Sequence, residues 1–239
     1  MNLRSEVSAV GLALSFLTVL PVPSKPLLES GALARATAYF PVAGYAVGAL
    51  VSLVLLLPTD AGVSAALAIA AWWALTGWLH FDGLVDSADA LQAPVSTDKR
   101  ADILKDVHVG AFALGTSLVT MLVMWSALAA GVTPWAPLVA AAVARALVLV
   151  PMRLYPTLEQ DSLGGQARTL GWGRVAAGLA IAAPTLLVPG AWLGWLLAGG
   201  ATALVTWWAA GRLAGRLSGD IYGLLITTAE VSVLVAFAF

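Results

Sequence analysis

The chain has 239 residues, of which 60% are apolar and only 10% carry a charge. Soluble domains carry about 25% charged residues, so this composition excludes an ordinary soluble protein and predicts an all-α, polytopic integral membrane protein. The net charge of −1 and the absence of cysteine give no reason to expect a nucleic-acid partner, and they exclude disulfides and thiolate metal ligands.

The N-terminal apolar segment, residues 7–20, is short and is followed by a Pro-Val-Pro sequence. Arg4 in front of it gives a faint likeness to a secretory signal peptide. Glu6 and the lack of an Ala-x-Ala cleavage site favour a segment that is retained. The sequence leaves open whether this segment spans the membrane or lies on its surface.

Six further apolar segments come close to the roughly 20 residues that a helix needs to cross a bilayer. They lie at 37–57, 61–79, 112–130, 134–150, 174–189 and 191–210. The last apolar segment, 221–239, is long enough but contains Glu230. We therefore predict six transmembrane helices plus N- and C-terminal apolar segments, seven or eight in total, in a single domain covering residues 1–239.

The connections between these segments are of two kinds. Three short ones, at 58–60, 131–134 and 189–190, hold no Lys or Arg, whereas four longer ones, at 21–36, 80–111, 151–174 and 211–219, hold most of the cations. Strict alternation of the helices puts all four longer connections on one side of the membrane. The positive-inside rule makes that side the cytoplasm, and nearly all polar chemistry is expected there.

The connection at 80–111 begins with closely spaced acids. In "HFDGLVDSADAL", Asp82, Asp86 and Asp89 have the spacing i, i+4, i+7, which puts them on one face of a helix. Three stacked carboxylates repel one another, and a divalent cation removes that cost. Hard oxygen ligands suit Mg²⁺ or Mn²⁺ together with substrate phosphates. The alternative is a solvated loop whose acids merely keep it out of the membrane.

The remainder of the connection is less distinctive. Asp98 and Asp102 lie among three cations and indicate an ordinary charged helix face. Lys105 and Asp106 directly precede the next apolar segment, where they could bind phosphate and metal respectively. The two histidines could be ligands, although a lone histidine more often satisfies a backbone group.

The connection at 151–174 combines Arg153 and Arg168 with a pair of glycines. This pattern suits an anion-binding loop for a nucleotide or another phosphate. The arginines also satisfy the positive-inside rule without any further function.

The C-terminal region holds three polar residues of interest. Ser218 and Asp220 could simply cap a helix. Glu230 lies roughly 15 Å along the apolar segment that follows. An acid at that depth is a functional candidate by default, and an ion pair with Arg145 is the structural alternative.

Five stretches carry a resemblance to a known family: "FLTVLPVP", "YFPVAGYAVG", "LHFDGLVDSADAL", "ILKDVHVGAFA" and "LSGDIYGLLITTAE". In this order, over the whole chain, they resemble the cobalamin synthase family, the adenosylcobinamide-GDP ribazoletransferases. The element H-x-D-G-x-x-D-x-x-D, with K-D-x-x-x-G-A-F about two dozen residues later, is specific. The resemblance implies an Mg²⁺-dependent membrane enzyme that joins adenosylcobinamide-GDP to α-ribazole or its 5′-phosphate. The products would be adenosylcobalamin, or its phosphate, and GMP.

The resemblance also implies which residues act. It points to Asp82, Asp86, Asp89, Lys105, Asp106, Gly110, Ser218, Gly219, Asp220 and Glu230. We predict that the first three aspartates, with Asp106, hold one or two Mg²⁺ ions and carry catalysis, and that Asp89 or Asp106 accepts a proton. Lys105, Arg153 and Arg168 are expected to bind phosphates. The enzyme would lie in a bacterial or archaeal cytoplasmic (inner) membrane with its active site facing the cytoplasm.

The chain departs from the family's usual pattern at three places. Ala90 stands where glycine is usual, His108 where arginine is common, and residues 216–218 replace a glycine-rich stretch. The departure at His108 puts the anion contact expected there in doubt. None of the three removes a carboxylate.

Two alternatives remain. A CDP-alcohol phosphotransferase or a prenyltransferase also uses aspartate-bound Mg²⁺, but no Ala-Arg follows Asp82-Gly83, and 151–174 lacks a second aspartate-rich motif. A transporter would place charged groups near the bilayer midplane, where only Arg145 and Glu230 qualify. The sequence leaves the oligomeric state open, a homo-oligomer included.

Overall fold

The computed structural model describes residues 3–22, 31–158, 167 and 170–239. Within these residues the secondary structure is helical, apart from one isolated β-bridge between Thr157 and Leu217. The all-α prediction is therefore confirmed. The helices that matter below, in chain order, are α1 (Leu3–Leu17), α2 (Ala32–Ala36), η1 (Thr37–Tyr39), α3 (Phe40–Leu55), α4 (Ala61–Leu75), α5 (Leu79–Gln92), α6 (Thr97–Ile103), α7 (Ala111–Ala129), α8 (Ala136–Leu147), α9 (Leu149–Leu154), α11 (Trp172–Ala182), η2 (Ala183–Leu187), α12 (Ala191–Arg212) and α13 (Gly219–Phe237).

Among the described residues, five stretches are long and apolar enough to cross a membrane. They are Ala32–Leu55, Ala111–Ala129, Ala136–Leu154, Ala191–Arg212 and Gly219–Phe237. This confirms a polytopic membrane protein. The C-terminal segment, uncertain from sequence because of Glu230, is one of the five.

Two predicted spans take a different form. The segment predicted at 61–79 breaks after α4, and α5 continues at an angle of 91°, so only the two helices together are long enough for a span. The segment predicted at 174–189 is α11 followed by the short 3-10 helix η2, which contains Pro184. Proline cannot donate a helical hydrogen bond, so the α-helix ends before it. The N-terminal α1 is shorter than a typical span.

The centre of the bundle is α8, which is rich in alanine and buried along almost its whole length. Small side chains allow neighbouring helices to approach closely, as is usual between membrane helices. At Gly44 and Gly48 of α3, an added Cβ would overlap the backbone of α8. These glycines therefore set the spacing of α3 and α8.

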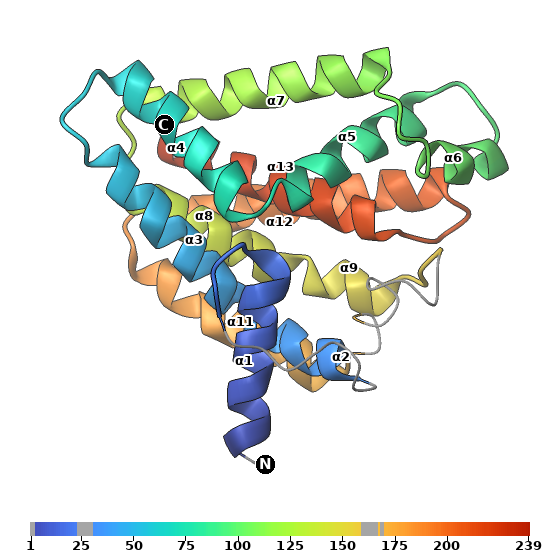
Figure 1. Ribbon diagram of the computed structural model, residues 1–239, viewed down its shortest axis with the longest axis horizontal. Helices are drawn as coiled ribbons and strands as arrows, with labels where there is room; N and C mark the ends of the chain where they lie inside the picture. Colours follow the sequence, from blue (N-terminus) through green and yellow to red (C-terminus); the bar gives the residue numbers. More distant parts are fainter. Residues whose placement is uncertain (1–2, 23–30, 159–166, 168–169) are drawn as a thin grey trace.

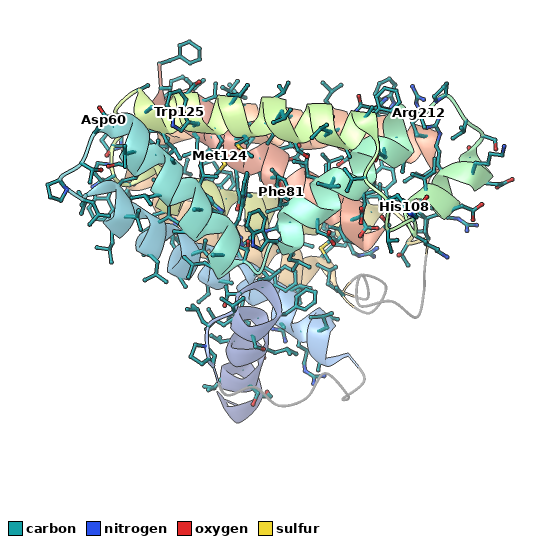
Figure 2. The ribbon with its side chains drawn as sticks, turned by 45° about the horizontal axis from the view of Figure 1, so that its top comes forward. Asp60, Phe81, His108, Met124, Trp125 and Arg212 are labelled. Carbon is teal, nitrogen blue, oxygen red and sulfur yellow. The ribbon has the colours of Figure 1, made fainter. Side chains whose placement is uncertain are left out.

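The two ends of the bundle differ in chemistry. Figure 1 shows α6 and the start of α7 at one end, and the α3–α4 connection and the C-terminus at the other. In Figure 2, His108 and Arg212 lie at the first end and Asp60 at the opposite one. Two of the four charged connections, at 80–111 and 211–219, thus lie at one end, and the short connection at 58–60 lies at the other.

Candidate active site

The break between α4 and α5 gives α5 its direction. Gly77 and Trp78 both have positive φ, 58° and 62°, a conformation that strains any residue other than glycine. The Trp78 ring packs against Trp73 and Phe81, with ring centroids 5.2 and 5.5 Å away. Thr76 Oγ1 donates to the Trp72 carbonyl oxygen over 3.1 Å. These contacts hold the strained turn, and the turn aims the acidic helix α5.

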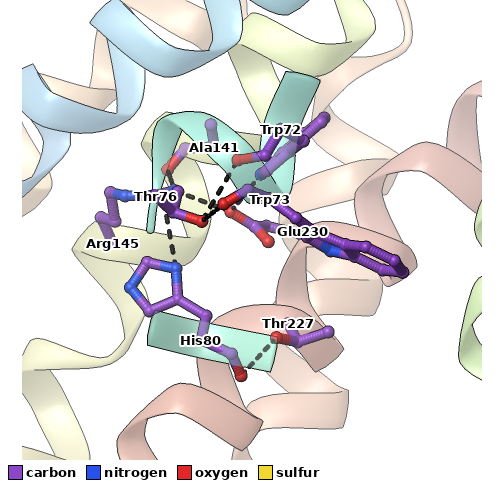
Figure 3. A network of polar contacts seen from close by, with 8 residues as sticks. All are labelled: Trp72, Trp73, Thr76, His80, Ala141, Arg145, Thr227 and Glu230. Atoms are coloured by element: carbon purple, nitrogen blue, oxygen red, sulfur yellow. Dashed lines mark hydrogen bonds and ion pairs between the residues drawn. The ribbon is translucent and has the colours of Figure 1, made fainter. Parts of the chain in front are cut away.

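A buried ion pair lies beside this break (Figure 3). Arg145 Nη1 donates to Glu230 Oε1 at 2.7 Å, and the same oxygen accepts a hydrogen bond from Trp72 Nε1 at 3.1 Å. Arg145 is 0% exposed and Glu230 3%. Removing either partner would leave an uncompensated buried charge. The structure thus contains the pair that the sequence offered as the structural alternative for Glu230. A contact of Glu230 with substrate stays a prediction.

Close packing of α5 on α13 brings the two acidic motifs together. A Cβ added at Gly83 would lie 2.6 Å from the Asp220 carbonyl oxygen and 3.0 Å from the Cα of Gly223. Because the helices touch here, Asp82 and Asp86 lie near the first turn of α13. The charges of Asp82, Asp220 and Asp89 all act on the Asp86 carboxyl, which is half-buried. Residues more than 130 positions apart therefore form one acidic site.

Asp89 has a defined structural role at this site. Its two carboxylate oxygens accept hydrogen bonds from the backbone N–H groups of Gly110, at 2.6 Å, and Ala113, at 2.9 Å. The first N–H groups of a helix have no partner within the helix, so Asp89 satisfies those at the start of α7. It ties α5 to α7. Its predicted role as a metal ligand or base stays a prediction.

Asp106 lies on the exposed connection between α6 and α7, outside the group of charges that acts on Asp86. Its Oδ1 lies 2.6 Å from His108 Nδ1 and accepts the His108 backbone N–H at 3.1 Å. These hydrogen bonds hold the pKa of the Asp106 carboxyl below its usual value. Lys105 next to it is exposed as well. The structure therefore places the Lys-Asp pair at the rim of the site.

On α6, Asp98 and Asp102 are exposed, as expected for a charged helix face. Arg100 is buried and donates to the carbonyl oxygens of Ala90 and Leu91, at 2.7 and 3.0 Å. Its guanidinium satisfies backbone carbonyls at the C-terminus of α5. Its positive charge also interacts favourably with the negative end of the helix dipole. Sequence reasoning missed this role, although an arginine shortly after a helix end is a recognisable signal.

The start of α13 is capped by Ser218, the structural alternative that the sequence offered, and a substrate contact of Ser218 or Asp220 stays a prediction. Ser218 Oγ accepts the Ile221 N–H at 3.3 Å and donates to Asp220 Oδ2 at 3.2 Å. Two backbone hydrogen bonds join Leu217 to the segment after α9, at Pro156 and Leu158. This bridge brings the third charged connection beside the start of α13.

Of the arginines predicted in that connection, Arg153 is half-buried and lies over the Trp172 ring, 5.5 Å from its centroid. A guanidinium over an indole face is a favourable cation–π contact. Arg168 lies outside the described residues, so its predicted phosphate contact stays a prediction.

A pocket of about 180 Å³ opens beside the acidic site. Its polar side chains are Asp82, Asp220, His80 and Tyr222, and the others are mostly apolar. The lining residues come from α1, α3, α5, α9 and α13, together with Val148, between α8 and α9, and Ala167. Sequence reasoning offered His80 as a possible ligand or as a group that satisfies the backbone, and it did not place His80 in a pocket with Asp220.

The described residues contain no group of three or more acids or histidines close enough to hold a metal ion. Mg²⁺ usually takes one or two protein carboxylates and completes its coordination with water and substrate phosphates. Asp86, with Asp82 or Asp220 nearby, fits that smaller requirement. The donor set is therefore compatible with a metal that binds together with a phosphate-bearing substrate.

Comparisons with known proteins match this chain to one family over nearly its whole length. A family model described as cobalamin-5-phosphate synthase matches residues 9–238. An adenosylcobinamide-GDP ribazoletransferase from Deinococcus radiodurans is 54% identical over 233 residues, 97% of this chain and 86% of the relative. A protein of that name from Bradyrhizobium diazoefficiens is 34% identical, over 100% of this chain and 96% of the relative. Another, from Thiobacillus denitrificans, is 37% identical, over 93% of this chain and 92% of the relative. No solved structure matches.

Proposed function

The chain belongs to the cobalamin-5-phosphate synthase family, and on that premise we propose that it joins adenosylcobinamide-GDP to α-ribazole or α-ribazole 5′-phosphate. The products are adenosylcobalamin, or its 5′-phosphate, and GMP, in the last stage of cobalamin biosynthesis. The observation that carries the proposal is the meeting of Asp82 and Asp86 on α5 with Asp220 at the start of α13.

The reaction transfers a phosphoryl-linked group. A ribose hydroxyl of the ribazole forms a new bond to phosphorus, the bond from that phosphorus to GMP breaks, and the hydroxyl proton passes to a base. Such transfers depend mainly on positioning and on neutralising charge. Carboxylates alone would repel a diphosphate, which supports the participation of a cation.

We assign that cation as Mg²⁺, with Asp86 and either Asp82 or Asp220 as the residues that would hold it. Bound there, Mg²⁺ would neutralise the diphosphate and the departing GMP. Asp82 and Asp220 both line the pocket, which supports either one as the proton acceptor. Asp89, held by the α7 amides, and Asp106, at the rim, are less well placed than the sequence suggested.

The cationic groups at the same end of the molecule supply the phosphate contacts in this proposal. Lys105 lies at the rim, and Arg153 belongs to the connection that is bridged to the start of α13. The concentration of Lys and Arg in these connections supports an orientation with the site at the cytoplasmic face of the membrane.

The test is the release of GMP by membranes or nanodiscs that contain Asp82→Asn or Asp86→Asn, measured against the Mg²⁺ concentration. We expect each substitution to lower kcat by about 100-fold or more and to raise the Mg²⁺ concentration needed for half-maximal rate. Asp98→Asn, on the exposed face of α6, is the matched control and should retain the wild-type rate. Wild-type rates and Mg²⁺ response in both site variants would contradict the metal assignment.

A further inference from the structure

His80 is a polar group of the pocket to which the proposed function gives no role. It is the second residue of α5, is only 4% exposed, and lines the pocket together with Asp82 and Asp220. Thr227 Oγ1 donates to its backbone carbonyl oxygen at 3.2 Å, which joins this turn of α5 to α13. The His80 backbone is therefore held at a defined position between the two helices.

The contact with Arg145 fixes which ring nitrogen carries the proton. Arg145 Nη2 lies 3.3 Å from His80 Nδ1, and a guanidinium can only donate hydrogen bonds. Nδ1 is then the acceptor, and the proton of the neutral ring lies on Nε2. The pairing of Arg145 with Glu230 holds the guanidinium in place for this contact.

His80 Nε2 is buried and has no hydrogen-bond partner in the part of the chain that the structure describes. In Figure 3 the dashed contact to Arg145 ends on one ring nitrogen of His80, and no dashed line reaches the other. A buried donor without a partner is unfavourable and is usually explained by a water, a ligand or a function. His80 lines the pocket, and Nε2 is its ring nitrogen that is left without a partner among the described residues.

The pocket itself indicates the kind of ligand. Phe16, Phe40 and Met152 form part of apolar walls, while the two aspartates lie at the polar part. Its volume of about 180 Å³ is below the ~300–1,000 Å³ of sites that enclose a drug-sized molecule. It cannot enclose a corrin macrocycle. It suits a flat, mostly apolar ring system with one acceptor atom and attached hydroxyl groups.

We propose that this pocket binds the benzimidazole base of α-ribazole, and that His80 Nε2 donates a hydrogen bond to the ring nitrogen that bears no ribose. The ribose hydroxyls then face Asp82 and Asp220, which accept hydrogen bonds. This inference rests on the proposed function, because α-ribazole is the second substrate of that reaction. His80 is in this assignment a substrate-binding residue.

The first experiment uses the wild-type protein in nanodiscs with two inhibitors. 5,6-Dimethylbenzimidazole carries the acceptor nitrogen, and 5,6-dimethylindole replaces that nitrogen by C–H at almost unchanged shape. We expect the benzimidazole to compete with α-ribazole and to bind about tenfold more tightly than the indole, the effect of one hydrogen bond in a buried site. Equal inhibition by the two compounds would overturn the proposal, and this comparison needs no variant.

The second experiment compares His80→Asn with His80→Gln. The asparagine carbonyl reaches the position of Nδ1 and keeps an acceptor for Arg145, but it offers no donor at the position of Nε2. The glutamine amide reaches the Nε2 position and keeps that donor. We expect His80→Asn to raise the KM for α-ribazole about tenfold, to leave the KM for adenosylcobinamide-GDP within about twofold, and to remove the discrimination between the inhibitors. His80→Gln should restore all three.

The opposite pattern, with His80→Asn normal and His80→Gln impaired, would show that His80 only supports Arg145, and the proposal would fail. A change of both KM values together would also contradict it. If the wild-type protein released no GMP from adenosylcobinamide-GDP in the presence of α-ribazole, the proposed function itself would fail. The two failures are therefore distinguishable.

Discussion

At the scale of single residues, Asp89 is both a member of the acidic site and the cap of a neighbouring helix. It belongs to the acidic face of α5, yet both of its oxygens accept hydrogen bonds from the start of α7. Gly110 makes this possible, because its backbone can approach the carboxylate closely. A Cβ at this position would lie 2.7 Å from Asp89 Oδ1.

Gly110→Ala should therefore displace the Asp89 carboxylate and uncap α7. We expect a loss of about 1 kcal/mol of stability, the usual value of a helix cap, and a lower rate of GMP release because the acidic site shifts. Thermal inactivation in nanodiscs and steady-state kinetics measure the two effects.

Gly115→Ala is the control for this substitution, because Gly115 lies in α7 five residues after Gly110 and a Cβ there meets nothing within 4 Å. It should behave like the wild type. If Gly110→Ala were as stable and as active as Gly115→Ala, the cap would contribute nothing to the site.

At this scale, the sequence predicted which acidic residues belong to the site more readily than it predicted which residues they contact. The i, i+4, i+7 spacing placed Asp82, Asp86 and Asp89 on one helical face, and the family motifs added Asp220. Periodicity is local, however, so it could not show that Asp89 caps a helix that begins more than 20 positions later. The role of His80 was hidden for the same reason, because it depends on Arg145 from a helix 65 residues away.

At the scale of elements, the decisive feature is the broken span formed by α4 and α5. The hydropathy of the apolar segment 61–79 predicts one continuous helix, because hydropathy depends on residue type and contains no information on backbone conformation. The break depends on the positive φ of Gly77 and Trp78, and the aromatic contacts that hold it involve residues on both sides of the turn. A glycine followed by an aromatic residue is too common a signal to predict such a break.

The crossing of α5 and α13 gives a prediction at this scale. Gly83→Ala would force the two helices apart, because the atom in its way is the Asp220 backbone carbonyl oxygen and cannot rotate aside. Overpacking of this kind costs about 1–3 kcal/mol. We expect a lower temperature of thermal inactivation and a loss of GMP release larger than the loss of stability alone explains.

Gly211→Ala, near the end of α12 and with nothing within 4 Å of an added Cβ, is the matched control and should leave both properties unchanged. Full activity of Gly83→Ala would mean that the acids of α5 and α13 need not lie this close together for catalysis.

At the scale of the whole molecule, an ion pair joins the N-terminal helix to the bundle. Arg174 of α11 donates two hydrogen bonds to the Glu6 carboxylate, at 3.0 and 3.2 Å, and the Tyr39 hydroxyl donates a third at 2.8 Å. The Arg174 hydrogen bond, and after it that from Tyr39, holds the pKa of Glu6 below its ordinary value of 4.5. Residues from three separate helical segments thus meet at one carboxylate.

This pair predicts a pH dependence for the attachment of α1. Because the pKa of Glu6 is lower in the folded state, its stabilising effect is complete above the unfolded value of 4.5 and is lost as the pH falls through the folded value. The thermal stability of the protein in nanodiscs should therefore decline between about pH 6 and about pH 3. Glu6→Gln should be less stable at neutral pH and should show a weaker decline. An identical pH profile in both proteins would exclude this role of Glu6.

The buried pair of Arg145 and Glu230 also constrains how the protein is made. Arg145 is synthesised 85 residues before its partner, and a lone arginine inside the hydrocarbon of a bilayer is costly. After α8 has been synthesised and before α13 is, the Arg145 guanidinium must remain at the translocon, at a membrane interface or beside water. The central helix of the bundle can settle into its final position only when α13 arrives, so completion of the acidic site is coupled to the end of membrane insertion.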